Sequence, residues 1–135
     1  MPVGYSGTPL PKKLGITEST RLLIINAPDD YLVLLGELPE GLICDKRLSK
    51  STTLIHLFTK SRSELEERLG YWRVKIATDT VVWISWPKKS SKVPTDITED
   101  VIREVALPLG FVDVKVCAVS DVWSGLKLVI RKELR

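Results

Sequence analysis

The residues with the clearest chemical potential form a run of basic and hydroxyl side chains, SWPKKSSKVPTD, at positions 85 to 96. Three lysines and two inner serines of this run can bind an anion: Lys88, Lys89, Ser90, Ser91 and Lys92. A shorter basic segment, TKSRS, adds Lys60 and Arg62. Cationic side chains hold an anion well when they surround the free amide hydrogens of a helix N-terminus. The competing interpretation is a basic, solvated connector between two elements.

His56, the single histidine of the chain, is the natural candidate for a general base. It lies in the middle of TLIHLFT, where the period of a strand predicts burial, so we interpret it as a hydrogen-bonded core residue. The sequence contains no GxSxG, P-loop, HExxH or GxGxxG motif and no evident hydrolytic triad. Asp96, Glu99 and Asp100 are interpreted as charges at the start of a helix. No catalytic residue is therefore predicted.

The two cysteines, Cys44 and Cys117, stand alone, without a CxxC pair or enough partners for a zinc site or a disulfide framework. We expect both to be reduced, buried thiols, and we expect no metal and no cofactor. The N-terminal residues MPVGYSGTPLPKK lack the apolar core of a signal peptide, and no run approaches the roughly 18 apolar residues of a membrane span. We therefore expect a cytoplasmic protein that is neither secreted nor inserted into a membrane.

The chain has the size and composition of one domain. Its 135 residues are 44% hydrophobic and 27% charged, enough to bury a core of two or three layers. The net charge of +3 is too small by itself to indicate nucleic acid. Within residues 1–20 we expect an irregular arm or a short helix around Leu10–Leu14. A single domain follows over residues 21–135.

Apolar runs that alternate with helical patterns predict the elements of this domain. Strands are expected at residues 21–26, 53–59, 80–86, 111–119 and 126–132, with a weaker strand near an edge in GLICDKRL. Helices are expected in DDYLVLLG, SRSELEERLGYWRVKIA and DITEDVIREVAL. The residues SDVWSG separate the last two strands, as suits a hairpin loop. Trp123 lies in that loop, where an exposed indole can anchor a protein partner, although packing over the end of the hairpin is the commoner outcome.

The helical segments carry signals for capping and for one buried face. The expected capping residues are Asp29 or Asp30, Ser63 with Glu66, and Asp96 with Glu99. The buried faces are expected to consist of Leu65, Leu69, Trp72 and Ile76 in the second helix and of Ile97, Val101 and Val105 in the third. Each helix therefore has a face that can cover a sheet.

These elements predict an α/β fold: a three-layer, Rossmann-like domain with a mainly parallel sheet, helices on both faces and a C-terminal antiparallel hairpin. Residues 21–26, 53–59 and 80–86 should be parallel neighbours, with the hairpin at one side. The carboxyl ends of parallel strands meet at one edge, which is where such folds bind ligands. NAPDD, TKSRS and SWPKKSSK should therefore converge at that edge and bring the basic side chains of the last two segments together.

Four stretches of the sequence carry a resemblance to a known family: GYSGTPLPKKLGI, LLIINAP, SWPKKSSKVPTDITEDVIREVALPLGFVDVKVCAV and VWSGLKLVIRKELR. They are similar to the bacterial domain-of-unknown-function 3052 family. The resemblance extends over nearly the whole chain and is most specific in the C-terminal half, whereas residues 29–58 are less distinctive. It implies a small bacterial intracellular protein with no established activity, and it assigns no catalytic residue.

The order strand, helix, strand, helix and closing antiparallel hairpin is also similar to the C-terminal half of class I methyltransferases that use S-adenosylmethionine. Those enzymes carry a Gly-rich turn after the first strand, where the backbone approaches the cofactor. Here the turn reads NAPDDY, which has no glycine and in which Pro28 removes an amide donor. Asp45 is the candidate acidic residue for the cofactor ribose, but Lys46 and Arg47 follow it and the spacing is short. These departures argue against cofactor binding.

Three functions remain open. The favoured hypothesis is a non-catalytic binding or regulatory domain that takes a small anionic ligand at the carboxyl edge of the sheet, with a protein partner or a second copy as further binding partners. The second is a diverged S-adenosylmethionine-dependent, methyltransferase-like enzyme that completes its site with a partner chain. The third is nucleic-acid binding through the basic loops and RKELR, which the small net charge disfavours.

Overall fold

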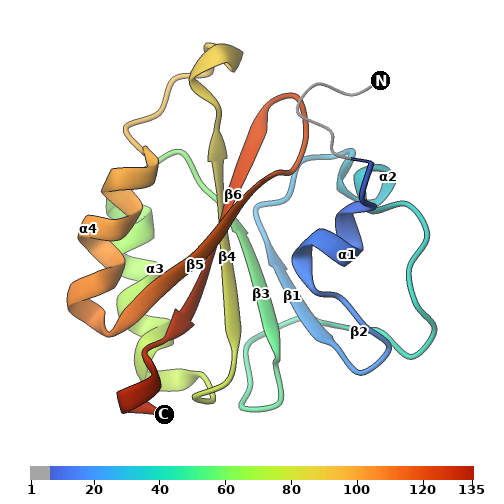
Figure 1. The fold of residues 1–135 in the computed structure, drawn as a ribbon, viewed down its shortest axis with the longest axis horizontal. Coiled ribbons are helices and arrows are strands. Elements are labelled where there is room, and N and C mark those ends of the chain that lie inside the picture. The colour runs from blue at the N-terminus through green and yellow to red at the C-terminus, as the bar shows by residue number, and fades with distance from the viewer. Residues whose placement is uncertain (1–6) are drawn as a thin grey trace.

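The centre of the protein is a six-stranded sheet with the strand order β2-β1-β3-β4-β6-β5. The computed structural model of the protein describes residues 7–135 (Figure 1). In chain order the strands are β1 (Arg21–Ile25), β2 (Ile43–Asp45), β3 (Leu54–Phe58), β4 (Val81–Pro87), β5 (Phe111–Ala118) and β6 (Trp123–Ile130). The first four strands run parallel, whereas β6 is antiparallel to β4 and β5 is antiparallel to β6.

The pairing confirms the predicted architecture. β3 pairs in parallel with both β1 and β4, so that Ile55 lies between Leu23 and Val82. The antiparallel pair lies at one side, and β2, only three residues long, forms the opposite edge. Every residue of β3 is buried, which explains why its sequence is a continuous apolar run around His56.

Helices cover both faces of this sheet. They are α1 (Leu10–Leu14), α2 (Tyr31–Leu35), α3 (Arg62–Lys75) and α4 (Glu99–Leu109), with short 3-10 turns η1 (Lys89–Ser91) and η2 (Lys132–Leu134). Figure 1 shows α3 and α4 side by side on one flank of the sheet and α1 with α2 on the other. The fold is therefore the expected three-layer α/β arrangement.

Each face of the sheet buries its own apolar core. The predicted face of α3, from Leu65 to Ile76, is buried under α4 and against β1, β3, β4 and β6. On the opposite face, Leu10 and Leu14 of α1 join Trp83 of β4, whose indole Nε1 donates to the Leu14 carbonyl oxygen at 3.0 Å. The N-terminal segment thus includes the predicted short helix, and that helix is part of the core. Residues 1–6 of the expected arm lie outside the described residues.

The helix caps lie two residues away from the predicted ones. Ser61, not Ser63, caps α3 by accepting a hydrogen bond from the Glu64 amide. Thr98, not Asp96, caps α4 by accepting from the Val101 amide. Asp30 precedes α2 but makes no side-chain cap. Of the face predicted for the third helix, Ile97 and Val105 are buried and Val101 is half-buried, whereas Ile102 and Ala106, which were not predicted, are fully buried.

For Trp123 the structure shows packing, the commoner of the two outcomes considered, whereas the expected burial of the two cysteines was wrong. β6 begins at Trp123, so the hairpin loop is shorter than six residues and Trp123 is a half-buried strand residue whose ring meets Phe58 edge to face at 5.1 Å. Cys44 is exposed on the edge strand β2, and Cys117 is only half-buried. Among the helices of residues 7–135, none combines the length and the apolar character that crossing a bilayer requires.

Candidate functional site

The strand order creates a topological switch point between β1 and β3. The chain leaves β1 through α2 to reach β2 on one side, and it then crosses back to β3 on the other side. In open α/β sheets, ligands bind in the crevice outside the carboxyl ends of the strands at such a point. The candidate site is therefore built from the ends of β1 and β3, the start of α3 and the segment that follows β2.

Asn26 occupies the turn at the end of β1. It has a φ of 60°, the left-handed conformation that favours glycine. Its side-chain Nδ2 donates to Glu64 Oε2 at 2.9 Å, and Thr59, at the end of β3, donates through Oγ1 to Glu64 Oε1 at 2.6 Å. Glu64 therefore ties the two strand ends to the first turn of α3, and both of its oxygens are hydrogen-bonded inside the protein.

The N-terminus of α3 is already occupied by side chains of the protein. The Arg62 amide donates to Asp96 Oδ1 at 2.7 Å, so a carboxylate stands where an external anion was predicted. The Arg62 guanidinium forms ion pairs with Glu104 at 2.8 Å and Glu66 at 3.2 Å. Hydrogen bonds to Glu104 and Glu66 raise the pKa of Arg62 above its ordinary value. Arg62 lies at the expected edge, but its charge is balanced there.

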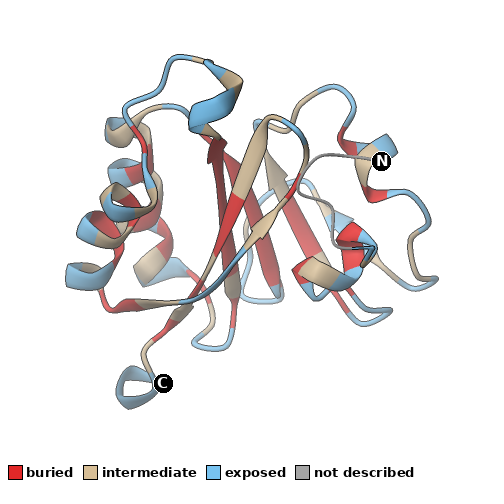
Figure 2. Ribbon diagram, turned by 45° about the horizontal axis from the view of Figure 1, so that its top comes forward, coloured by how far each residue is buried: buried red, intermediate tan, exposed pale blue. Residues whose placement is uncertain are grey.

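The lysine loop, residues 88–96, also lies at this edge and is anchored at both ends. The Lys88 amide donates to the Val122 carbonyl at 2.7 Å, while the Asp96 amide and the Thr95 hydroxyl donate to the Lys60 carbonyl. Figure 2 shows the loop projecting beyond the strands as a largely exposed segment. Lys60, Lys89, Ser90 and Lys92 are exposed and Lys88 is half-buried.

The two serines of this loop differ in what they offer a ligand. The Ser91 hydroxyl donates to the Lys88 carbonyl at 2.6 Å and accepts from the Val93 amide, so it is used within the loop. Ser90 is exposed on the first turn after β4. The structure thus brings the predicted lysines to one edge, as the topology requires.

A groove of about 790 Å³ opens beside the switch point, on the α3 face of the sheet. It is lined by Leu23 and Ile25 of β1, by residues 46–48 after β2, and by one side of α3 between residues 63 and 72. We call it the switch-point groove. Its floor is apolar, and the segment after β2 supplies two exposed cations, Lys46 and Arg47. Neither cation forms an ion pair within residues 7–135.

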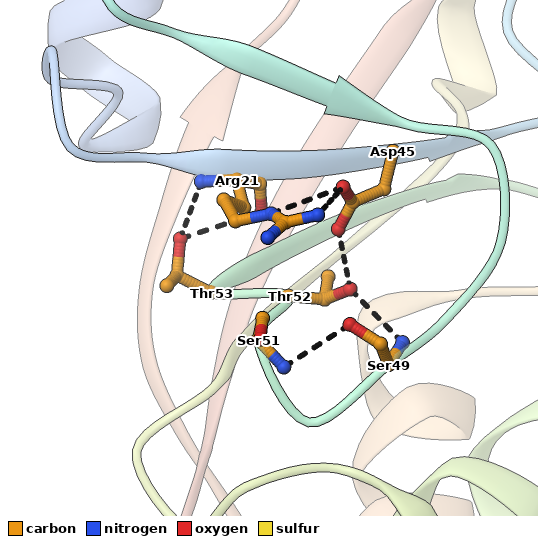
Figure 3. A network of polar contacts seen from close by, with 6 residues as sticks. All are labelled: Arg21, Asp45, Ser49, Ser51, Thr52 and Thr53. Carbon is orange, nitrogen blue, oxygen red and sulfur yellow. Dashed lines mark hydrogen bonds and ion pairs between the residues drawn. The ribbon is translucent and has the colours of Figure 1, made fainter.

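A polar network fixes the segment that carries these cations (Figure 3). Asp45, whose side chain is 6% exposed, accepts from Arg21 Nη2 at 2.8 Å and from the Thr52 hydroxyl at 2.7 Å. Hydrogen bonds from Arg21 and Thr52 hold the pKa of Asp45 below its ordinary value. The Ser49 amide donates to Thr52 Oγ1, and the Ser51 amide donates to Ser49 Oγ, which closes the turn. Asp45 is therefore engaged at the base of the connection.

His56 belongs to a second polar network, in the core between β3, β4 and α2. Its Nδ1 lies 2.7 Å from the Tyr31 hydroxyl, and its Nε2 lies 2.6 Å from the Ser85 hydroxyl. All three side chains are buried. Burial lowers the pKa of His56 to about 3 and raises the pKa of Tyr31. The neutral imidazole satisfies both hydroxyls and has no access to a substrate, which confirms the prediction of a hydrogen-bonded core histidine.

A second cavity, of about 940 Å³, lies on the other face between α1, α2 and the tip of the β5-β6 hairpin. Its lining is largely apolar, including Leu10, Val33 and Val119, and it borders Pro9 near the start of the described residues. Trp123 packs against the core of this face. Among residues 7–135, no three metal-ligating side chains lie together.

Comparisons with known proteins identify the fold of this chain but no family. No family model matches the chain, and no curated protein matches it significantly. These comparisons therefore do not support the resemblance to the domain-of-unknown-function 3052 family. Solved structures, in contrast, share the architecture over most of the chain.

Three of these solved structures illustrate the shared fold. A Sulfolobus solfataricus protein provisionally assigned as a type 11 methyltransferase has a TM-score of 0.59 at 13% identity, over 91% of this chain and 90% of that one. The m1A22 tRNA methyltransferase TrmK of B. subtilis has a TM-score of 0.54 at 10% identity, over 92% and 66%. A Streptococcus agalactiae protein of the NADB-Rossmann superfamily has 0.53 at 13%, over 96% and 70%. The chain thus has a Rossmann-like, methyltransferase-like fold.

Sequence reasoning missed the groove and its two cations. Lys46 and Arg47 were noted only as neighbours of Asp45, because nothing local shows that the connection after β2 faces α3. Their signal in the sequence is the adjacent basic pair directly after a strand, at the edge where ligands of such folds bind.

Proposed function

We propose that the chain is a non-catalytic binding or regulatory domain that holds a small anionic ligand at the carboxyl edge of its sheet, in the switch-point groove. The observation that carries this proposal is the pair Lys46 and Arg47, two cations without an ion-pair partner in the described residues, beside an apolar floor. Ligand sites are typically concave and mostly apolar, with a few polar groups that fix orientation.

The lysine loop supports the same function from a distance. Lys60, Lys88, Lys89 and Lys92 stand at the carboxyl edge, largely exposed to solvent. Clustered charges of one sign raise the local concentration of the opposite ion and speed its association. In this proposal the loop attracts the anion and the groove holds it.

Absence of catalysis is favoured by how three candidate groups are used. His56 is buried between two hydroxyls, and the carboxylates of Glu64 and Asp45 accept hydrogen bonds from the protein itself. A general base must reach the proton that it abstracts. None of these three groups is free to do so in this arrangement.

A second candidate, a diverged S-adenosylmethionine-dependent methyltransferase-like enzyme, is favoured by one observation besides the fold. Asn26 adopts the left-handed backbone conformation at the turn where those enzymes carry glycine. Against this candidate, Pro28 removes an amide donor from the turn, and Asp45 is held by Arg21 and Thr52 instead of facing a ribose.

Thermal unfolding with added ligands distinguishes these two functions. We expect 1-naphthyl phosphate, adenosine monophosphate or another small anion to raise the Tm, with an effect that weakens as NaCl is added. A ligand at about one hundred times its Kd stabilises by about 2.7 kcal/mol, a shift of several degrees. S-adenosylmethionine, which carries a positive sulfonium, should have no comparable effect. If only S-adenosylmethionine stabilises the protein, the methyltransferase-like candidate replaces ours, and if no anion binds, the proposed function is wrong.

A further inference from the structure

We propose that the switch-point groove selects molecules that join a flat apolar body to one anionic group, a phosphate, sulfonate or carboxylate. The anionic group meets Lys46 and Arg47, and the body lies on the apolar floor beside Tyr71. This inference rests on the proposed function and specifies the chemistry of its ligand.

The floor and one wall of the groove suit an apolar, planar body. The floor consists of Leu23, Ile25 and Leu48. Leu23 belongs to the main core, and Ile25 and Leu48 pack against that core. Tyr71 of α3 stands on the wall with 58% of its surface exposed. An aromatic ring so exposed can gain contact area by stacking with a ligand, with little loss of side-chain freedom.

The charges that line the groove leave an excess of positive charge on one wall. Three cations and two carboxylates line it: Lys46, Arg47, Arg68, Glu64 and Glu67. Arg68 pairs with Glu64 at 3.7 Å, and Glu64 is also held by Asn26 and Thr59. Two cations then face one remaining carboxylate, a balance of 2 − 1 = +1. The guanidinium of Arg47 suits an oxyanion because its planar donors match two oxygens at once.

The backbone that carries Lys46 and Arg47, the cationic wall of the groove, is anchored on both sides in the free protein. The Asp45 network closes the connection at its base, and Lys50 Nζ donates to the Ile76 carbonyl at 3.5 Å near the end of α3. Leu48 packs against the main core between these two points. A wall that is fixed in the free protein loses less conformational entropy on binding. The network of Figure 3 is thus a positioning device for Lys46 and Arg47.

The size of the groove sets the class of ligand. Its volume of about 790 Å³ falls in the range of small-molecule sites. A body of one or two fused rings with a single acidic group fits this space. The ring system alone would contact only the apolar floor, and the acidic group alone would contact only Lys46 and Arg47.

Three probes separate the contributions: 1-naphthyl phosphate carries body and anion, 1-naphthol carries the body alone, and inorganic phosphate carries the anion alone. Titration by isothermal calorimetry should give clear binding only for 1-naphthyl phosphate. Amide chemical shifts in ¹⁵N-labelled protein should change at residues 46–48 and along the groove side of α3. The double variant Lys46→Ala, Arg47→Ala should weaken binding by about tenfold or more, the effect of losing charge-assisted hydrogen bonds.

The matched control is Lys88→Ala, Lys89→Ala, which removes the same charge from the lysine loop. It should weaken binding only a few-fold, and added NaCl should abolish the difference. All four side chains are exposed or half-buried, so both double variants should keep the wild-type Tm without ligand.

Each outcome decides between the two proposals. The groove inference is wrong, and the proposed function stands, if 1-naphthyl phosphate binds the wild type but only the lysine-loop variant loses this binding. The same holds if the amide chemical shifts that the probe changes belong to residues of the α1-α2 cavity. Equal affinity for 1-naphthol, or for phosphate alone, overturns the combined ligand chemistry. If no probe binds and no small anion changes the Tm, the proposed function itself fails.

Discussion

Acid should destabilise this protein through one side chain, His56. Its imidazole is fully buried, and its two hydrogen-bond partners, Tyr31 and Ser85, are neutral hydroxyls. Burial lowers the pKa of His56 to about 3, because the charged ring would lose its hydration without gaining an opposite charge. In the unfolded chain the same ring titrates near its ordinary pKa of 6.5.

The sign and size of the effect follow from this difference. Between pH 6.5 and about 3 only the unfolded chain takes up the proton. The contribution of His56 to stability is therefore complete above pH 6.5 and is lost as the pH falls, by up to about 1.4 kcal/mol per pH unit. Lowering the pH from about 7.5 to about 5 should reduce the free energy of unfolding by about 2 kcal/mol.

Urea unfolding at several pH values in this range measures the loss. Asp45 and Asp113 also have lowered pKa values, but their contributions to stability are lost only as the pH falls towards and below their ordinary value of 3.8. Because His56 is the single histidine, a His56→Gln variant should be less stable at neutral pH and nearly insensitive to pH above about 5. Tyr31→Phe keeps the buried ring, so it should lose about 1 to 2 kcal/mol and retain the pH dependence. A flat wild-type profile would refute this account of His56.

Three further predictions concern the α3 face and the site. Leu69→Ala should cost about 2 to 5 kcal/mol in urea unfolding, because Leu69 is fully buried under α4; a wild-type midpoint would contradict this. Replacing Lys88, Lys89 and Lys92 together by alanine should slow the association of 1-naphthyl phosphate in stopped-flow measurements at low salt only, and unchanged rates would exclude electrostatic attraction by the loop. Thr52→Val should weaken binding of the same probe in calorimetry, whereas Thr52→Ser should restore it, since the hydroxyl holds the cationic wall; equal affinities in both variants would show that the wall needs no such support.

Much of the fold was predictable because the buried strands are continuous apolar runs. β3 shows this most clearly, since all five residues from Leu54 to Phe58 are buried. The start of β6 was not predictable in the same way. Ser124 and Gly125 look like turn residues, and only the packing of Trp123 against Phe58 shows that the strand has begun.

The cap of α3 illustrates a choice that local sequence does not make. Ser61 and Ser63 each precede a glutamate by three residues, Glu64 and Glu66, so both have the spacing of a capping box. The structure selects Ser61 because the carboxylate of Asp96, far along the chain, reaches the next amide. Helix boundaries of this kind depend on tertiary contacts.

The candidate site was predicted in part, for a similar reason. Parallel strands bring Lys60 and the lysine loop to one edge, and the period of β3 indicates that His56 is buried. Which charges remain unpaired is a different question. Arg62 is balanced by Glu104, which lies 42 residues away in the chain, and Lys46 faces a groove whose other wall is α3. Only the three-dimensional packing decides these pairings.

The groove and the Asp45 network both lie at the short connection between β2 and β3. A crossover between parallel strands ordinarily takes a dozen or more residues and usually contains a helix. Here the chain passes from β2 to β3 through residues 46 to 53 alone, and this connection contains no helix. So short a connection must be closed tightly, and Asp45 closes it by binding Arg21 and Thr52. The carboxylate of Asp45 is thus engaged by the chain itself, at the base of the segment whose next two residues, Lys46 and Arg47, line the groove.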